Sequence, residues 1–159
     1  MAQTPAVEHA VKATFLYKFA PFIEWPPGTF AATSDPLVIC VVGSDAVAEL
    51  VDDAVKGQTI GGHAIEVVHR PASAPDARCH ILYVALRGPA AARVLDNVRG
   101  RAVLTVTDDA SAASARGIVN FVVQDNRVRF EIDLRGAAEN HLVISSKLLN
   151  LATRVSPKP

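Results

Sequence analysis

The chain has 159 residues, half of them hydrophobic, and its 16 basic side chains balance 16 acidic ones. A chain of this length can bury roughly 68–70% of its unfolded surface in one core, so we expect a single domain over residues 1–159, ordered from about residue 6 to 155. The basic residues are scattered, and the apolar runs are far shorter than the roughly 20 residues of a membrane helix. These features argue against a nucleic-acid partner and against direct insertion into a membrane.

The N-terminal region is rich in aromatic residues, six of the nine in the chain lying between Phe15 and Phe30. Helical spacing predicts an amphipathic helix here, with Lys12 largely off its apolar face. Pro21 should end or kink this helix near residues 19–20, because proline has no amide donor and its ring clashes with the preceding turn. The apolar stripe consists of Val7, Val11, Phe15, Leu16, Phe19, Phe22 and Ile23.

Two functions are open for this aromatic segment. It is either a packing helix or a helix whose following residues, Phe22 and Trp25, stay partly exposed as anchors for a partner or a small aromatic ligand.

The middle of the chain alternates strands with helices. Short β-branched apolar runs predict strands buried on both faces of a parallel sheet, and the segments between them have helical spacing or turn residues. The segment PASAPDAR, residues 71–78, is expected to be a surface connection. The predicted strands are residues 37–42, 63–69, 81–86 and 103–106, and the predicted helices are residues 46–55 and 89–98.

The pattern changes towards the C-terminus. Residues 118–123 and 128–134 predict two strands joined by a tight hairpin, the second alternating between apolar and charged residues and lying at an edge of the sheet. Ser145 or Ser146 should cap a final helix that Pro157 ends, with an apolar stripe of Leu148, Leu149, Leu151, Ala152 and Val155. We therefore expect a three-layer α/β fold, with a mostly parallel central sheet, a C-terminal antiparallel hairpin and helices on both faces.

Catalytic motifs are absent from the sequence, and we expect neither an enzyme nor a cofactor. The turn Gly43-Ser44-Asp45 is either a weak anion site or a plain helix cap. His63 and His69 are too far apart along a strand to share a metal and should lie on the surface, and His80 is a satisfied histidine or a weak metal or proton-sensing group. Glu131 and Asp133 could form an acid–base pair, although neighbouring arginines favour charge neutralisation on a solvated strand.

Cys40 and Cys79 are the two cysteines of the chain, and they lack the spacing of a closed metal site. Both lie in apolar, strand-like runs, where they are either small buried hydrophobic residues or partners in a disulfide, which would require an oxidising compartment. The polar start MAQTPAVEH resembles a mature N-terminus without its signal peptide, and a cytosolic protein fits equally well.

Several segments taken together resemble the YfiR family of small periplasmic regulators, over nearly the whole chain from about Ala10 to Val155. The most specific pairing is that of the phenylalanine-rich helix ending in Glu24-Trp25-Pro26 with the closing ISSKLL. The segments are VKATFLYKFAPFIEWP, LVICVVG, CHILYV, VLTVTD, VRFEIDL and HLVISSKLLNLA.

The resemblance implies a regulator and not a catalyst. Family members repress a membrane-anchored diguanylate cyclase through its periplasmic sensor domain, and so control cyclic di-GMP and biofilm formation. The resemblance also implies a disulfide between Cys40 and Cys79, with Cα atoms within about 7 Å. A second cysteine pair of some relatives is absent, and Pro21 replaces the more usual lysine.

We therefore expect a periplasmic inhibitory protein whose partner is the periplasmic domain of an inner-membrane diguanylate cyclase or another sensor protein. Phe22, Trp25 and Glu131 are the expected contact residues for the partner or a ligand. The alternative function is a periplasmic small-ligand receptor subunit for a sensor kinase or transporter. The N-terminal aromatic segment and the stripe around Leu148 offer more apolar surface than one sheet face covers, which predicts a homodimer.

Overall fold

The computed structural model describes residues 5–30, 32, 34–70, 79–108 and 115–156. The helices are α1 (Pro5–Lys18), the 3₁₀ turn η1 (Ala20–Phe22), α2 (Asp45–Val55), α3 (Gly88–Asn97), α4 (Leu134–Glu139) and α5 (Ser146–Leu149). The strands are β1 (Ile23–Glu24), β2 (Leu37–Val42), β3 (Thr59–Ile60), β4 (His63–Arg70), β5 (Ile81–Val84), β6 (Leu104–Asp108), β7 (Val119–Gln124), β8 (Arg127–Asp133), β9 (Val143–Ile144) and β10 (Arg154–Ser156).

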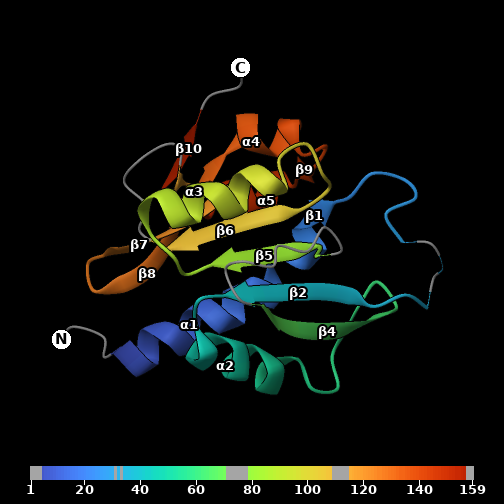
Figure 1. The fold of residues 1–159 in the computed structure, drawn as a ribbon, viewed down its shortest axis with the longest axis horizontal. Helices are drawn as coiled ribbons and strands as arrows, with labels where there is room; N and C mark the ends of the chain where they lie inside the picture. Colours follow the sequence, from blue (N-terminus) through green and yellow to red (C-terminus); the bar gives the residue numbers. More distant parts are fainter. Residues whose placement is uncertain (1–4, 31, 33, 71–78, 109–114, 157–159) are drawn as a thin grey trace.

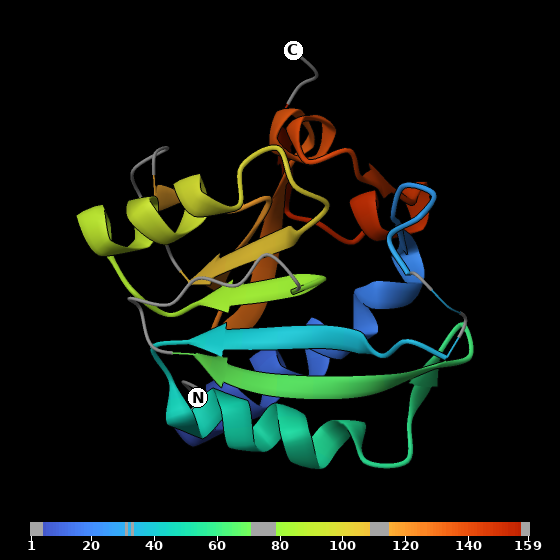
Figure 2. The same ribbon diagram turned by 45° about the vertical axis from the view of Figure 1, so that its right-hand side comes forward.

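Eight strands form a mixed, mostly parallel sheet in the order β10-β8-β7-β6-β5-β2-β4-β3. Helices α1 and α2 cover one face and α3 covers the other, as Figures 1 and 2 show. Every residue of β5 is buried because both faces of this central strand are covered, which is why its sequence is continuously apolar. The predicted three-layer α/β architecture is confirmed.

The predicted hairpin near the C-terminus is confirmed by the antiparallel pairing of β7 with β8. Its turn residues Asp125 and Asn126 both have positive φ angles, as a two-residue hairpin turn that follows the sheet twist requires. The prediction that the second hairpin strand is an edge was wrong. Strand β10 pairs in parallel with β8 on its outer side, placing Arg154 opposite Glu131.

The long C-terminal helix was also predicted wrongly. Ser145 does cap a helix, accepting a hydrogen bond from the Lys147 amide, but α5 ends at Leu149. The Thr153 amide donates to the Phe130 carbonyl at 2.9 Å, which directs the following residues into the sheet as β10. Pairing with β8 therefore overrides the helical spacing of apolar residues near the C-terminus. As a result, Leu151 is 62% exposed.

The N-terminal helix ends as Pro21 predicts, with α1 stopping at Lys18 and the proline lying inside η1. The buried face of this helix differs from the predicted apolar stripe. Lys12, predicted to lie largely off the stripe, is only 5% exposed, and Val7, predicted to lie on it, is 45% exposed. The buried face of α1 is rotated towards Lys12 because this lysine has an ionic partner on the sheet, described below.

The cysteines Cys40 and Cys79 form a disulfide, with their Cα atoms 5.7 Å apart, which confirms that prediction. Cys40 lies on β2, and Cys79 lies two residues before the start of the neighbouring strand β5. Both are buried in the apolar layer beneath α3. The predicted surface connection at residues 71–78 lies outside the described residues.

In the described part of the chain, no helix is both long enough and apolar enough to cross a bilayer.

The disulfide gives a first testable prediction. Replacing both cysteines by alanine should lower the free energy of unfolding by about 2–4 kcal/mol, because the bond closes a loop of 39 residues. Urea unfolding with and without reductant measures the effect. Reductant should destabilise the wild-type protein and leave the double variant unchanged, and equal stability of oxidised wild type and double variant would contradict the expectation.

Candidate functional site

The aromatic segment near the N-terminus is joined to a segment near the C-terminus. Strand β1 pairs antiparallel with β9, with Ile23 opposite Ile144 and Glu24 opposite Val143. The Ser145 amide adds a hydrogen bond to the Phe22 carbonyl at 2.9 Å. The two segments that most specifically carry the family resemblance are therefore direct neighbours in the fold.

Phe22 and Trp25 flank this short pairing, and both are half-buried against the core between the sheet and α1. The Trp25 ring meets His80 edge to face, with ring centroids 6.1 Å apart. Its indole Nε1 is buried and has no hydrogen-bond acceptor among the described residues. An unpaired buried donor costs about 1–3 kcal/mol, and because this atom is buried, an incoming acceptor could reach it only after the neighbouring side chains move.

Three rings form a stack beside Trp25. Phe30 lies between His63 and His80, with ring centroids 4.0 Å and 4.5 Å away and nearly parallel planes. The Nδ1 atom of His63 is 2.6 Å from the Asp35 carbonyl oxygen. The prediction that His63 is a surface residue was therefore wrong, because its ring covers Phe30 and is half-buried.

His80 also binds the neighbouring strand. Its backbone amide donates to the Val38 carbonyl at 2.8 Å, and its Nδ1 accepts from the Val38 amide at 2.9 Å. The second bond requires Nδ1 without a proton, so neutral His80 carries its proton on Nε2. Burial, and then repulsion from His63, lower the pKa of His80 below its ordinary value of 6.5, although Asp35 opposes this effect. Of the two alternatives from the sequence, the satisfied histidine agrees with this geometry.

This hydrogen bond makes stability depend on pH. Because the pKa of His80 is lower in the folded protein than in the unfolded chain, the unfolded chain binds more protons just below pH 6.5. The free energy of unfolding should therefore fall as the pH drops from 6.5 towards the folded-state pKa, and level off below it. Chemical denaturation at several pH values between 7.5 and 4.5 measures the slope.

The variant His80→Asn should flatten this part of the profile, because an asparagine oxygen can accept from Val38 without titrating. The exposed His141, replaced by asparagine, is the matched control and should keep the wild-type slope. An unchanged slope in His80→Asn would show that another group causes the dependence.

Glu131, the third expected contact residue, lies in a separate polar network across the sheet. Its Oε1 accepts from Asn120 Nδ2 at 3.2 Å, while Asn120 Oδ1 accepts from the Thr107 hydroxyl at 2.8 Å. Asp133 does not act with it as an acid–base pair, because the Asp133 carboxylate caps α4 by accepting from the amides of Arg135 and Gly136. Ser44 likewise caps α2, accepting from the Val47 amide, in agreement with the plain helix cap.

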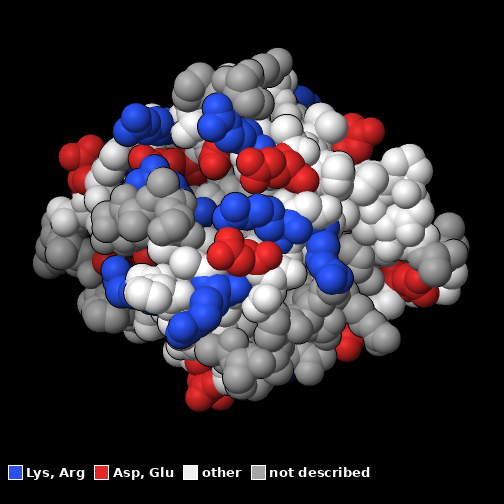
Figure 3. Space-filling view, turned by 45° about the horizontal axis from the view of Figure 1, so that its top comes forward, with Lys and Arg blue, Asp and Glu red and all other residues white. Residues whose placement is uncertain are grey.

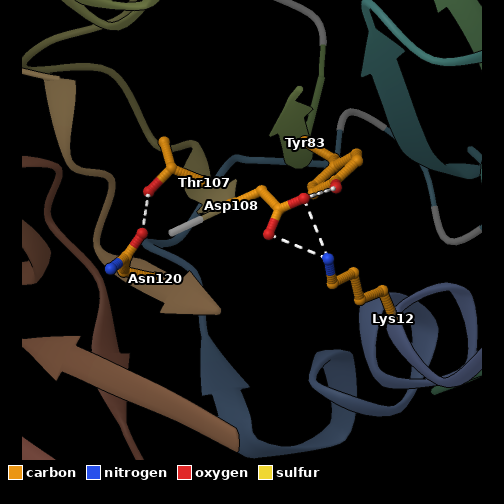
Figure 4. A network of polar contacts seen from close by, with 5 residues as sticks. All are labelled: Lys12, Tyr83, Thr107, Asp108 and Asn120. Atoms are coloured by element: carbon orange, nitrogen blue, oxygen red, sulfur yellow. Dashed lines mark hydrogen bonds and ion pairs between the residues drawn. The ribbon is translucent and has the colours of Figure 1, made fainter. Parts of the chain in front are cut away.

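An ionic contact between the buried Lys12 and the half-buried Asp108 joins α1 to the sheet, and the sequence did not indicate it. Lys12 Nζ donates to both oxygens of Asp108, at 2.8 and 2.9 Å, and the Tyr83 hydroxyl donates to the same carboxylate at 3.3 Å. Burial and the adjacent Asp108 charge raise the pKa of Tyr83, so this hydroxyl stays a donor. Figure 4 shows that Asp108 points towards Lys12 while the preceding Thr107 points towards Asn120. The only signal in the sequence is a lysine between two apolar residues of the helix.

A polar cavity of about 200 Å³ lies between α3 and α4, with Thr105 from β6, Ile118 from just before β7, and Arg116, Asp133 and Glu139 among its lining residues. Figure 3 shows that basic and acidic side chains are interleaved on the face that carries α3, α4 and β10. In the described ranges, no three histidine, cysteine or acidic side chains lie close enough to hold a metal ion.

Comparison with known protein families identifies a relationship over most of the chain. A family described as YfiR/HmsC-like matches residues 9–153. No curated protein matches the chain.

Proposed function

The chain belongs to the YfiR/HmsC-like family, and on this premise we propose that it is a periplasmic protein that inhibits a membrane-anchored diguanylate cyclase. It would bind the periplasmic sensor domain of the cyclase and so control cyclic di-GMP and biofilm formation. The observation that carries this proposal is the family match over residues 9–153, since the family names imply regulation of diguanylate cyclases and not catalysis.

The periplasmic location is supported by the bond between Cys40 and Cys79. Disulfides form and persist in oxidising compartments, among them the bacterial periplasm, and are rare in the cytosol. The disulfide is consistent with a site of action outside the cytoplasm, where the sensor domain of the proposed partner lies.

The contact surface that we propose centres on Phe22 and Trp25. Both side chains are half-buried, so each has a fixed position and an accessible part, as aromatic anchors of interfaces have. We propose Glu131 as a further, separate contact residue, because it is half-buried on another part of the sheet.

Truncating Trp25 tests this surface. Trp25→Ala should weaken binding of the cyclase sensor domain roughly thirtyfold, the effect of losing about 2 kcal/mol at an interface, and should raise cyclic di-GMP in cells that express both proteins. Trp25→Phe keeps most of the packed ring and removes only the N–H donor, so it should weaken binding less.

Melting temperature separates an interface effect from a loss of folding. The matched control is Phe19→Ala, because Phe19 is 1% exposed and its truncation should lower the free energy of unfolding by about 3–5 kcal/mol. Trp25→Ala should lose much less stability than this control. A Trp25→Ala protein that is unfolded, or that represses the cyclase fully, would contradict the anchor role.

We also propose a homodimer, through the N-terminal helix alone and not through the stripe around Leu148 that the sequence also suggested. Leu148 is buried and cannot contribute, whereas Val7, Val11 and Phe15 line an apolar groove along α1. Sedimentation at high micromolar concentration should show dimers that dissociate on dilution, and Val7→Glu should weaken them. Leu151→Glu, on another exposed apolar residue, is the control, and a wild-type monomer at all concentrations would exclude the dimer.

A second candidate function is a small-ligand receptor for a sensor kinase or transporter. The polar cavity between α3 and α4 favours it, because Arg116, Asp133 and Glu139 could bind a small charged molecule. The neighbouring genes distinguish the two functions. A gene for a GGDEF-type cyclase with a periplasmic domain supports the inhibitor, and an operon with a sensor kinase or transporter supports the receptor.

A further inference from the structure

Strand β4 leaves most of one sheet edge open. It pairs with β2 through residues 65–70, but on its outer side β3 pairs only with His63 and Ala64. In the part of the chain that the structure describes, no strand pairs with residues 65–70 on that outer side. Alternate N–H and C=O groups of these residues therefore point away from the sheet.

The open edge lacks most of the features with which proteins usually protect such edges. Residues 65–70 are Ile-Glu-Val-Val-His-Arg, with no proline and no lysine, and their charged residues are Glu66 and Arg70. Their pairing with β2 runs without a bulge over six consecutive residue pairs. The strand that lies outermost at the opposite end of the sheet, β10, has only three residues and is a poor template by comparison. An unprotected edge of this length is able to accept another strand.

Helix α2 places a row of carboxylates along this edge. Asp45, Glu49 and Asp52 are spaced i, i+4 and i+7, so they share one side of the helix. Together with Ala48, Val67 and His69 they line a groove of about 360 Å³ between α2 and β4. Figures 1 and 2 both show β4 outside β2, with α2 alongside it.

Most of this negative charge has no partner. Asp45 contacts His69 Nε2 at 2.8 Å, which joins the helix to the strand. No basic side chain among the described residues pairs with Glu49, Asp52 or the exposed Glu66. An occupant of the edge would therefore meet the negative surface and the half-buried Val67 on the α2 side of the sheet, whereas Glu66 and the half-buried Val68 lie on the other side.

We propose that the outer edge of β4 binds an extended segment of a partner protein that carries basic residues at alternate positions. The segment pairs with residues 65–70 as a further strand of the sheet. It lies on the same outer side of β4 where β3 pairs with residues 63 and 64. Alternate side chains of a strand are about 6.6 Å apart, and the carboxylates follow one another along α2 at rises of about 4.5–6 Å. Lysine or arginine at every second position therefore meets the acidic row, while the residues between face the other side of the sheet.

The acidic row argues against a second copy of the chain as the occupant. Two β4 strands paired antiparallel around a two-fold axis normal to the sheet would put both α2 helices on the same side. Glu49 and Asp52 of the two copies would then approach each other, which opposes association. The proposal does not depend on the identity of the cyclase partner or on the Trp25 surface.

Binding of a synthetic peptide tests the proposal. The probe is the acetylated and amidated peptide Lys-Val-Lys-Val-Lys-Val-Lys, compared with its counterpart in which glutamate replaces each lysine, against the full chain in low-salt buffer. We expect saturable binding of the lysine peptide only. The double variant Glu49→Gln/Asp52→Gln should weaken it about tenfold, as the loss of two charge contacts predicts. Asp53→Asn is the matched control, since Asp53 pairs with Lys56, and should leave affinity unchanged.

Amide hydrogen exchange identifies the binding place. In the free protein, the outward-pointing amides of residues 65–70 should exchange fast, and the lysine peptide should protect them. A peptide methylated on the amides that face β4 should not bind, whereas methylation of the opposite set should be tolerated. Absence of binding, binding that the double variant leaves unchanged, or binding without protection of β4 would each overturn the proposal. Protection that rises with protein concentration alone would assign the edge to a second copy instead.

Discussion

The ionic contact between Lys12 and Asp108 determines where the N-terminal helix lies. A lysine with its amine removed from water needs an acceptor within reach, and the Asp108 carboxylate, which also accepts from the Tyr83 hydroxyl, supplies that acceptor at one place on the sheet. With α1 held there, the rings of Phe15 and Phe19 pack against Phe121 and Phe130 from the hairpin. The same placement sets where η1 begins, and so carries Phe22 and Trp25 to the pairing of β1 with β9.

Much of the fold could be predicted from the sequence, because the strands and longer helices have clear periodicity. In β8 the apolar residues Val128, Phe130 and Ile132 are buried, and Arg127 and Arg129 are exposed, as their alternation indicates. Strand β10 could not be predicted, because three residues have no measurable period and their strand conformation depends on pairing with β8. The burial of Lys12 depends in the same way on a residue 96 positions away.

The candidate site was predictable only in part, for a related reason. Aromatic composition indicated Phe22 and Trp25, but not the ring stack beside them. That stack combines Phe30, His63 and His80 from three separate segments, and nothing in their spacing connects them. The result is a rigid support for Trp25, since Cys79 is bonded to β2 and the adjacent His80 binds the same strand through Val38. A surface held in this way loses little conformational entropy when a partner binds.

The pairing of β1 with β9 also has a consequence for biosynthesis. Synthesis proceeds from the N-terminus, so the aromatic segment emerges early, whereas its partners β9 and Ser145 emerge near the end of the chain. Contacts between distant parts of a chain form slowly because a large loop must close first. The segment richest in phenylalanine is thus made long before its partners and is among the last to be covered. In that interval it is the part of the nascent chain that most needs a chaperone.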